Sequence, residues 1–543
     1  MRTPAMPVIW SIAGTDSGGG AGLAADQRAA DAFGVHLCPV VAAVTAQNTT
    51  TVTHIEPMPA ALLEAQLAAL AADLPPRVIK TGLLGSATNA RVLARWVDRL
   101  RAHGPVALVL DPVLRANTGA ALVDEPLLQV YRQELLPRAS VITPNQREVT
   151  ALLAADAPQG VPAQAAALRA RGVQAVVITG GDADTPGLSH DWLDTPHACG
   201  WLTLPRVVTT HQHGTGCTFA SALAAALALG WVAADAVVLA KMASTHALRH
   251  ASAVGQGAGP VLACAGFGTD PTLLPHLSLD DLPPERWATG LRGCARAPGV
   301  YAIANSAEQV AAVLRATPTV DTIQLRLKRP AGSSDAAWSA QLQDAIVRSQ
   351  GAADAAQVLL VINDHWRAAL AAGARALHLG QADLLALTAP ERAELQAARA
   401  QGVQLGLSSH SLWELCRAAG LQPDLIACGP VWPTTTKDMP WVPQGLDNLA
   451  WWAHMAPAPV VGIGGILEPG QLQAVAASGA AGGCVVRGLG DDPSRTLPSW
   501  LGAWDLGRQG DLGTLIPHLP HPTLIHDWSS PGGMPEPSSS KVF

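Results

Sequence analysis

The first half of the chain alternates short apolar, β-branched runs with alanine-rich stretches of helical length. The short runs predict buried strands at residues 8–13, 40–44, 77–80, 107–110, 140–142 and 175–179. Helix-length runs such as 60–73 and 88–103 lie between several of them. Strands that alternate with helices form a largely parallel sheet with helices on both faces, so we predict a three-layer α/β/α domain over residues 1–262.

The second half repeats a strand-and-helix unit eight times. Strand-like runs occur at residues 300–304, 322–327, 358–362, 376–379, 404–407, 425–428, 460–463 and 483–486. Each is followed by a helix-length stretch or a turn. This count is typical of a compact (β/α)8 TIM barrel, whose chemistry collects at the carboxyl ends of the strands. We therefore predict a barrel over residues 299–518.

Two segments lack this periodicity. Residues 263–298 carry five prolines, at positions 271, 275, 283, 284 and 298, and are predicted to be a linker that includes at most a short helix. Residues 519–543 are rich in proline, serine and glycine and are predicted to be a flexible tail.

Composition excludes several classes of protein. The 543 residues are 49% hydrophobic and 14% charged, which suits packed cores, and a net charge of −7 without a basic tract argues against nucleic acid as a partner. The eight cysteines show no CxxC spacing, so neither a zinc site nor a disulfide framework is favoured. The start of the chain lacks a signal-peptide pattern, and a reduced cytoplasmic setting is expected. A homo-oligomer is left open.

One apolar stretch, residues 219–240, is as long as a membrane span and holds a single charge, Asp235. A Gly-Trp pair at 230–231 divides it, and a glycine-rich turn precedes it. We therefore predict two buried helices and no membrane partner.

The most informative motif is HGTGCT at residues 213–218, directly before that apolar helix. Gly214 and Gly216 allow a close backbone approach, and the amides that open the helix favour an anion such as a transferring phosphoryl group. Cys217 lies at this helix start, where the pKa of a thiol tends to fall. The motif indicates phosphoryl transfer beside a candidate base.

Further polar residues follow other strands of the first half. A glycine-rich turn spans residues 14–22, Asp26 lies on the helix behind it, and Gln47 ends the next strand. A carboxylate and an amide facing a cleft can pair with an aminopyrimidine. Asn145 and Glu148 offer oxygen ligands for Mg²⁺ or its waters, which fits nucleotide chemistry, although an ordinary first-turn helix charge explains Glu148 equally well.

Taken together, these motifs resemble the hydroxymethylpyrimidine and hydroxymethylpyrimidine-phosphate kinases, which have a ribokinase-like fold. The resemblance rests on residues 14–22, 45–49, 80–82, 111–113, 143–145, 213–218 and 255–260. It implies that Asp26 and Gln47 hold the pyrimidine, that Cys217 is the base at the hydroxymethyl group, and that ATP is the phosphoryl donor. Thr179 stands where the family usually has a lysine facing the ATP phosphates. Lys241 is a candidate substitute for that charge.

The predicted barrel carries polar residues at most of its strand ends. Gln324, Arg326 and Lys328 alternate along one predicted strand and so share a face. Asp364 and Asp383 bring two carboxylates to the same rim, which suits Mg²⁺ bridging a diphosphate. Further hydroxyls, amides, a cation and a glycine turn follow other strands: Asn363, Ser408, Thr434, Thr436, Lys437 and Gly465.

This second set resembles thiamine phosphate synthase over residues 299–490. The resemblance implies that Gln324, Lys328 and Asn363 contact a pyrimidine diphosphate and that Asp364 and Asp383 hold Mg²⁺. It also implies phosphate contacts from Ser408, Thr434, Thr436, Lys437 and Gly465, with catalysis depending more on Mg²⁺ and Lys437 than on a general base. Arg487 stands where the family normally has a serine. It either binds phosphate more strongly, crowds the site or lies on the surface.

The sequence therefore predicts a bifunctional thiamine biosynthesis enzyme. The first half would phosphorylate hydroxymethylpyrimidine and its monophosphate, and the second would couple the diphosphate with thiazole phosphate, giving thiamine phosphate and pyrophosphate. The alternative is a kinase for a related ring alcohol such as pyridoxal, with a non-catalytic barrel that binds or regulates.

Overall fold

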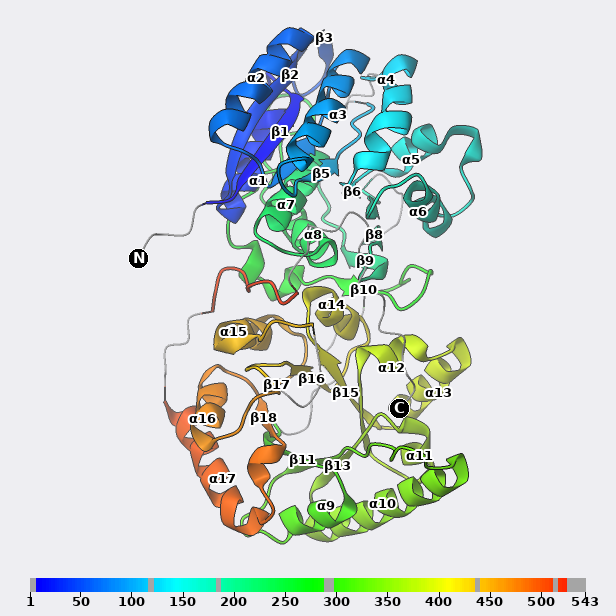
Figure 1. The fold of residues 1–543 in the computed structure, drawn as a ribbon, viewed down its shortest axis with the longest axis vertical. Coiled ribbons are helices and arrows are strands. Elements are labelled where there is room, and N and C mark those ends of the chain that lie inside the picture. The colour runs from blue at the N-terminus through cyan, green and yellow to red at the C-terminus, as the bar shows by residue number, and fades with distance from the viewer. Residues whose placement is uncertain are drawn as a thin grey trace. The chain divides into compact units, whose positions relative to one another are not determined.

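The structure of the protein is a computed structural model (Figure 1). The chain forms two compact units. The structure describes residues 6–115, 122–181, 187–287, 297–434, 440–510 and 516–524. The first unit extends to residue 287, and the second comprises the described residues from 297 to 524.

The first unit is built on a ten-stranded sheet with the order β10-β9-β8-β7-β6-β5-β4-β1-β2-β3. Its strands are β1 (Val8–Gly14), β2 (His36–Gln47), β3 (Val52–Pro57), β4 (Val78–Thr81), β5 (Ala107–Leu110), β6 (Val141–Ile142), β7 (Val176–Ile178), β8 (Leu188–Asp194), β9 (Cys199–Pro205) and β10 (His276–Leu277). The strands from β2 to β7 in this order are parallel, and β3, β8, β9 and β10 pair antiparallel. The six predicted strands are all confirmed, whereas the antiparallel edges were not predicted.

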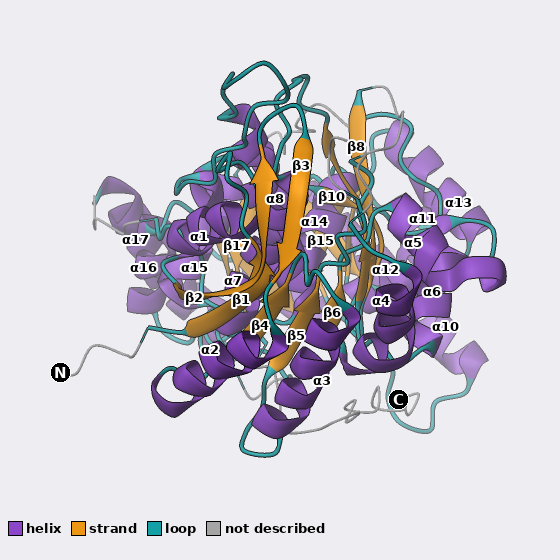
Figure 2. Ribbon diagram, turned by 90° about the horizontal axis from the view of Figure 1, so that it is seen from above, coloured by secondary structure: helices purple, strands orange, loops and turns teal. Residues whose placement is uncertain are grey.

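Helices cover both faces of this sheet (Figure 2). One face packs the larger apolar core against α2 (Ala60–Asp73), α3 (Ala87–Arg101), α4 (Glu125–Val130), α5 (Gln146–Leu153) and α6 (Val161–Ala170). The other face carries α1 (Gly22–Phe33), α7 (Thr215–Ala228) and α8 (Ala233–Arg249). Alanine-rich α7 is buried along nearly its whole length because small side chains let it approach both the sheet and its neighbouring helices.

The apolar stretch at 219–240 forms parts of α7 and α8, with a break at residues 229–232, as predicted. Within the described ranges, no helix has the length and apolarity needed to span a bilayer.

The predicted linker begins too early. Two single 3₁₀ turns, η4 (Phe267–Thr269) and η5 (Pro271–Leu273), precede β10, which pairs with β9 at the edge of the first sheet. Prolines are compatible with these turns and with a strand at the sheet edge. The many prolines therefore do not mean that this segment is unstructured. Residues 288–296 lie outside the described residues.

The second unit is a closed barrel of eight parallel strands. These are β11 (Gly299–Ala304), β12 (Thr322–Leu325), β13 (Leu359–Asn363), β14 (Ala376–Leu379), β15 (Gln404–Ser409), β16 (Leu425–Cys428), β17 (Val460–Gly462) and β18 (Gly482–Val485). The surrounding helices are α9 (Ala307–Leu314), α10 (Asp335–Ala356), α11 (Trp366–Ala371), α12 (Gln381–Ala386), α13 (Ala389–Ala400), α14 (Leu412–Gly420), α15 (Gly445–Met455), α16 (Pro469–Ala477) and α17 (Pro493–Gln509). All eight predicted strands are present. Hydroxyl caps begin several helices, as Ser306 does for α9 and Ser411 for α14.

The predicted tail at 519–543 also begins too early. The Asn448 side chain on α15 donates to the His521 carbonyl at 3.0 Å, and the His521 amide donates back to the Asn448 side-chain oxygen at 2.8 Å. The Val442 amide donates to the Thr523 carbonyl at 2.8 Å. These bonds hold the segment on the barrel, while residues 525–543 lie outside the described part of the chain.

Candidate active sites

The first site lies at β1, where the strand order of the sheet reverses. From β1 the chain continues to β2 on one side of it and later to β4 on the other. Such a change opens a crevice at the carboxyl ends of the strands, where α/β proteins bind ligands. The glycine-rich turn after β1 and the start of α7 meet in this crevice, because a Cβ on Gly214 would collide with the carbonyl oxygen of Gly20. Gly214 has φ 85°, a conformation that glycine adopts without strain.

A chain of polar side chains links the two segments. The Asp16 carboxylate accepts from the amides of Gly18, Gly20 and Ala21 at 2.8–3.0 Å, and His213 Nε2 lies 2.8 Å from Asp16 Oδ2. Although burial opposes the effect, His213 and the amides of Ala21 and Gly18 together lower the pKa of Asp16. The half-buried side-chain amide of Gln47 lies 3.4 Å from the same His213 nitrogen. Gln47 therefore lies beside the start of α7, while its contact with a pyrimidine stays a prediction.

Lys80 forms a buried ion pair behind this crevice. Its ammonium lies 2.8 Å from Asp26 Oδ1 and 3.7 Å from Asp111 Oδ2, and neither Lys80 nor Asp26 has solvent-exposed side-chain surface. Burial alone would lower the pKa of Lys80, but the surrounding negative charge raises it above its usual range. Burial raises the pKa of Asp111 to about 6.

The oxygens of Asp26 are occupied within the protein. Ser11 Oγ donates to one oxygen at 2.6 Å, and Ser221 Oγ donates to the oxygen that faces Lys80 at 2.8 Å. The prediction that Asp26 faces an open cleft is therefore corrected: its carboxylate is the counter-ion that keeps Lys80 charged.

Cys217 lies in the first turn of α7, half-buried and near Lys80. Burial raises the pKa of its thiol to about 12, and Asp26 and Asp111 act in the same direction. The Lys80 ammonium and the amide of Gly22 oppose this rise without reversing it. The expected fall in pKa is therefore contradicted, because burial and the two carboxyls raise the thiol pKa more than Lys80 and the Gly22 amide lower it.

A cavity of about 400 Å³ opens on the other side of the α7 start. It is lined by three residues predicted for nucleotide binding, Asn145, Thr179 and Lys241. Glu148, predicted as a Mg²⁺ ligand, and Gly216 also line it. A cavity of this size suits a small cofactor or nucleotide. Because Gly216 belongs both to the HGTGCT motif and to the cavity wall, the two form one continuous site.

The charges in this cavity differ from the prediction. Lys241 is buried, and its ammonium lies 2.7 Å from Asp191 Oδ2 and donates to Ser189 Oγ at 2.9 Å, so its charge is balanced within the protein. Three arginines also line the wall: Arg115, Arg147 and Arg206. They supply positive charge close to Thr179, where the family resemblance implies a lysine.

Asn145 and Glu148 form a capping box at the start of α5. The Asn145 side chain accepts from the amides of Arg147 and Glu148 at 3.0 Å, and Glu148 Oε2 accepts from the Asn145 amide at 2.9 Å. Glu148 Oε1 accepts from the Leu114 amide at 3.3 Å. These bonds fix both side chains on the cavity wall and give Glu148 a structural role there.

The second site is the carboxyl end of the barrel. Asp364, which follows β13, has φ 63°, a left-handed conformation that aspartate tolerates better than most residues. Its carboxyl group lies close enough to that of Asp383, at the start of α12, for the two to interact. Burial and the neighbouring Asp383 raise the pKa of Asp364 to about 6, because two adjacent carboxylates repel each other. Two oxygen donors that are difficult to ionise together fit a hard divalent cation such as Mg²⁺.

Gln324 and Asn363 are joined inside the barrel. Gln324 donates from its amide to Asn363 Oδ1 at 3.0 Å and accepts from the Tyr301 hydroxyl at 3.0 Å. The predicted shared strand face of Gln324, Arg326 and Lys328 is wrong, because β12 ends at Leu325. Arg326 is half-buried in the following loop, near enough to Asp364 to lower its pKa, and Lys328 is exposed.

The remaining predicted barrel residues lie at or after the ends of later strands, with Ser408 inside β15. Ser408 Oγ is 2.9 Å from Nε2 of His378, a buried histidine whose pKa is lowered to about 4 by burial. Gly465 has φ 73°, and its backbone lies against Trp432, so only glycine fits there. Thr434 is half-buried, whereas Arg487 is exposed at the turn after β18. Thr436 and Lys437 lie outside the described residues.

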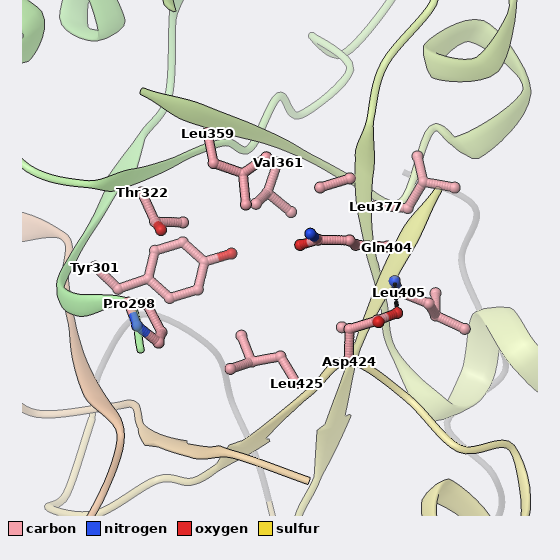
Figure 3. A pocket seen from close by; sticks show the side chains of 12 residues that line it. Pro298, Tyr301, Thr322, Leu359, Val361, Leu377, Gln404, Leu405, Asp424 and Leu425 are labelled. Carbon is pink, nitrogen blue, oxygen red and sulfur yellow. Dashed lines mark hydrogen bonds between the residues drawn. The ribbon is translucent and has the colours of Figure 1, made fainter. Parts of the chain in front are cut away.

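A much smaller cavity, about 20 Å³, lies at the opposite end of the barrel strands (Figure 3). It is lined by residues at the strand starts, including Thr322, Leu359, Gln404 and Leu425. Nearby, the Asp424 carboxylate accepts from the Leu405 amide at 2.8 Å. Its size and position indicate a packing gap in the barrel core, since conserved chemistry in this fold occupies the other end.

The fold and both sites define a two-domain transferase, in which a ribokinase-like small-molecule kinase precedes a TIM-barrel synthase. The phosphomethylpyrimidine kinase family matches residues 16–262, and the thiamine monophosphate synthase family matches residues 299–489. The chain belongs to the family of bifunctional thiamine biosynthetic enzymes, with these two domains in this order.

Three relatives support this assignment by their sequences. The thiamine biosynthetic bifunctional enzyme of Oryza sativa is 31% identical over 509 residues, covering 90% of this chain and 86% of the relative. That of Arabidopsis thaliana is 32% identical and covers 90% of each chain. A hydroxymethylpyrimidine/phosphomethylpyrimidine kinase of Synechococcus elongatus is 40% identical, covering 47% of this chain and 97% of the relative. A solved ADP complex of Bacillus subtilis pyridoxal kinase aligns with 48% of this chain and 98% of its own, at 28% identity and a TM-score of 0.44.

The sequence reading missed several residues of the first site. Lys80 and Asp111 belong to recognised motifs at the ends of β4 and β5, but no local pattern shows that they pair with Asp26. Asp16 lies in the glycine-rich turn, and its partner His213 is 197 positions away, so no local pattern indicates their contact. The arginines of the cavity come from separate segments, so only the fold brings them together.

Proposed function

We propose that the first domain transfers phosphoryl groups from ATP to hydroxymethylpyrimidine and then to its monophosphate. The observation that carries this proposal is the continuity of the cavity with the start of α7 through Gly216. A triphosphate in the cavity would direct its terminal phosphate towards the first-turn amides of α7, which have no partner within the helix. The arginines on the wall would balance the remaining phosphate charge.

The substrate alcohol would lie in the crevice between Gln47 and Cys217. Its hydroxyl oxygen would attack the terminal phosphorus, the bond to the bridging oxygen would break, and ADP would leave. Cys217 would accept the hydroxyl proton in the small fraction of molecules in which its thiol has already lost its own proton to solvent. Lys80 supports this role, because its positive charge opposes the rise in the thiol pKa and would stabilise the thiolate.

We propose that the barrel then joins the pyrimidine diphosphate to thiazole phosphate. Asp364 and Asp383 would hold Mg²⁺, which when bound neutralises charge on the departing pyrophosphate. Gln324 and Asn363, fixed by their mutual hydrogen bond, would orient the pyrimidine ring. Ser408 and Gly465, with Thr434, Thr436 and Lys437, would bind phosphate, and Arg487 would add a cation after the last strand.

Kinetics with two alcohols test the kinase assignment. The purified chain with MgATP should show a kcat/KM for hydroxymethylpyrimidine at least about tenfold above that for pyridoxal, because the Gln47 amide can pair with both a ring nitrogen and an amino group. Equal or better use of pyridoxal would favour the alternative ring alcohol.

Pyrophosphate release tests the barrel. The full chain, given authentic pyrimidine diphosphate, thiazole phosphate and Mg²⁺, should release one pyrophosphate for each thiamine phosphate formed. Absence of turnover would favour a binding or regulatory barrel. The cytoplasmic location remains a prediction.

A further inference from the structure

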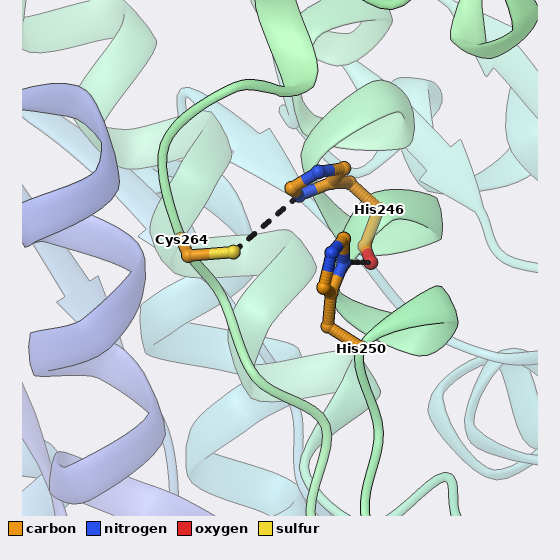
Figure 4. A group of neighbouring side chains, drawn as sticks. All are labelled: His246, His250 and Cys264. Carbon is orange, nitrogen blue, oxygen red and sulfur yellow. Dashed lines mark hydrogen bonds between the residues drawn. The ribbon is translucent and has the colours of Figure 1, made fainter.

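Three side chains of metal-binding type gather at the carboxyl end of α8 in the first unit. His246 and His250 are one helical turn apart, and Cys264 comes from the segment that follows the helix (Figure 4). Each residue offers one ligand atom, and these three atoms all lie within 4.8 Å of one another. The CxxC criterion could not detect this cluster, because it combines a helical histidine pair with one distant cysteine.

Backbone hydrogen bonds hold the segment that carries Cys264. The Val261 amide donates to the His213 carbonyl at 3.0 Å, and the Leu262 amide donates to the Ala247 carbonyl at 3.2 Å. Val261 and Ala263 also pack in a small core with Ala29 and Ala247. The cysteine is therefore positioned against α8 before any ligand binds.

The nitrogen atoms are prepared for ligation. His250 Nδ1 lies 2.9 Å from the His246 carbonyl oxygen, an arrangement that places hydrogen on Nδ1 and leaves the Nε2 lone pair available. His246 presents Nδ1 to the Cys264 thiol (Figure 4). Neutral imidazole is the form that binds metals.

The spacing of sulfur and nitrogen is close to that of a zinc site. Cys264 Sγ lies 3.7 Å from His246 Nδ1. With Zn–S of about 2.3 Å and Zn–N of about 2.0–2.1 Å, tetrahedral coordination places these atoms about 3.6 Å apart. Only a small adjustment of the more exposed His250 would complete the three-ligand set.

We propose that His246, His250 and Cys264 bind a divalent transition metal of the zinc class, with the fourth position open to water. Binding replaces the thiol proton of Cys264, which is released to solvent, by a metal–sulfur bond. The metal would join α8, whose Thr245 and Leu248 line the nucleotide cavity, to the segment bonded to His213. Metal occupancy would then stabilise the kinase site without taking part in either reaction.

The test is a zinc titration of the full, chelator-stripped chain against a competing chromophoric chelator. Excess Mg²⁺ is present so that Asp364 and Asp383 do not take zinc. We expect one zinc per chain and a higher Tm of the kinase unit. Replacing zinc by cobalt should give a thiolate-to-metal charge-transfer band.

Variants identify the ligands. Cys264→Ser and His250→Gln should each weaken zinc binding at least about hundredfold, since loss even of groups that only orient metal ligands costs 10–100-fold. Cys264→Ser should also abolish the cobalt band. Cys199→Ser, which removes an exposed cysteine on β9, is the matched control and should bind zinc as the wild type does. Absence of zinc binding by the wild type, or unchanged binding by Cys264→Ser, would overturn the proposal and leave a structural Cys–His contact.

Discussion

At the scale of single residues, buried charge decides the properties of the kinase site. Lys80 has no access to water, yet Asp26 and Asp111 keep it protonated. Ser11 and Ser221 complete the hydrogen bonding of Asp26, so the pair is satisfied within the core. The positive charge of Lys80 next to Cys217 therefore depends on the Asp26 carboxylate, whose hydrogen-bonding partners all lie within the protein.

Asp26→Ala should lower the free energy of unfolding of the kinase unit by about 3–5 kcal/mol, because it leaves the Lys80 ammonium buried without its nearest partner. Ser221→Ala, which removes one neutral donor from the same carboxylate, should lower it by only about 0.5–1.5 kcal/mol. Urea unfolding followed by tryptophan fluorescence measures both. Wild-type stability in Asp26→Ala, combined with a raised KM for the pyrimidine, would show instead that this carboxylate binds substrate.

The raised pKa of Cys217 predicts how its reactivity depends on pH. A thiol with a pKa of about 12 is protonated near neutrality. As long as the pH stays below that pKa, each increase of one pH unit raises the thiolate fraction tenfold. Alkylation of Cys217, followed peptide by peptide, should therefore accelerate about hundredfold between pH 7 and pH 9. In the urea-unfolded chain the same peptide should level off near pH 9, since a free thiol has a pKa of about 8.5. A plateau below pH 8 in the folded chain would contradict the assigned shift.

At the scale of elements, the start of α7 depends on two glycines that do different things. Gly214 has a positive φ and touches the Gly20 carbonyl, so it joins α7 to the turn after β1. Gly216 has open space around its Cα and lines the nucleotide cavity. The same residue type serves chain geometry at one position and ligand access at the other.

Gly214→Ala should destabilise the kinase unit by more than about 1 kcal/mol and remove kinase activity, because the new methyl group strains the backbone and separates the two segments. Gly216→Ala should leave the Tm unchanged or slightly raised, since alanine favours a helix, while raising the KM for ATP. Thermal melts and steady-state kinetics distinguish the two variants. If the two variants had the same Tm and the same KM for ATP, α7 would tolerate a shift of its first turn.

At the scale of the whole molecule, the two chemistries lie in separate compact units, each with its own core. Cys217→Ala should therefore abolish phosphorylation while pyrophosphate release from added diphosphate continues. Asp364→Asn should do the reverse, and asparagine is the matched change because it also tolerates the positive φ at this position. Assays of both reactions in each variant decide the matter, and loss of both activities in either one would show that the domains are coupled.

The sequence determined the architecture because strand and helix periodicity is local. Six parallel strands of the kinase sheet and all eight barrel strands follow from apolar runs, and the ends of those strands marked Gln47, Asn145 and Asp364 as polar candidates. The antiparallel edge formed by β8, β9 and β10 was not predicted, because β8 and β9 bury polar residues such as His190, Asp191 and Thr203, which interrupt an apolar run.

Only the tertiary structure decided the electrostatics, since these depend on residues far apart in the chain. Asp16 and His213 are 197 positions apart, yet they form one hydrogen bond, and Lys80 pairs with Asp26 across 54 positions. The pKa of Cys217 follows from burial beside these groups rather than from its helix position. Burial and charge partners are properties of the folded chain, so no local pattern could have supplied them.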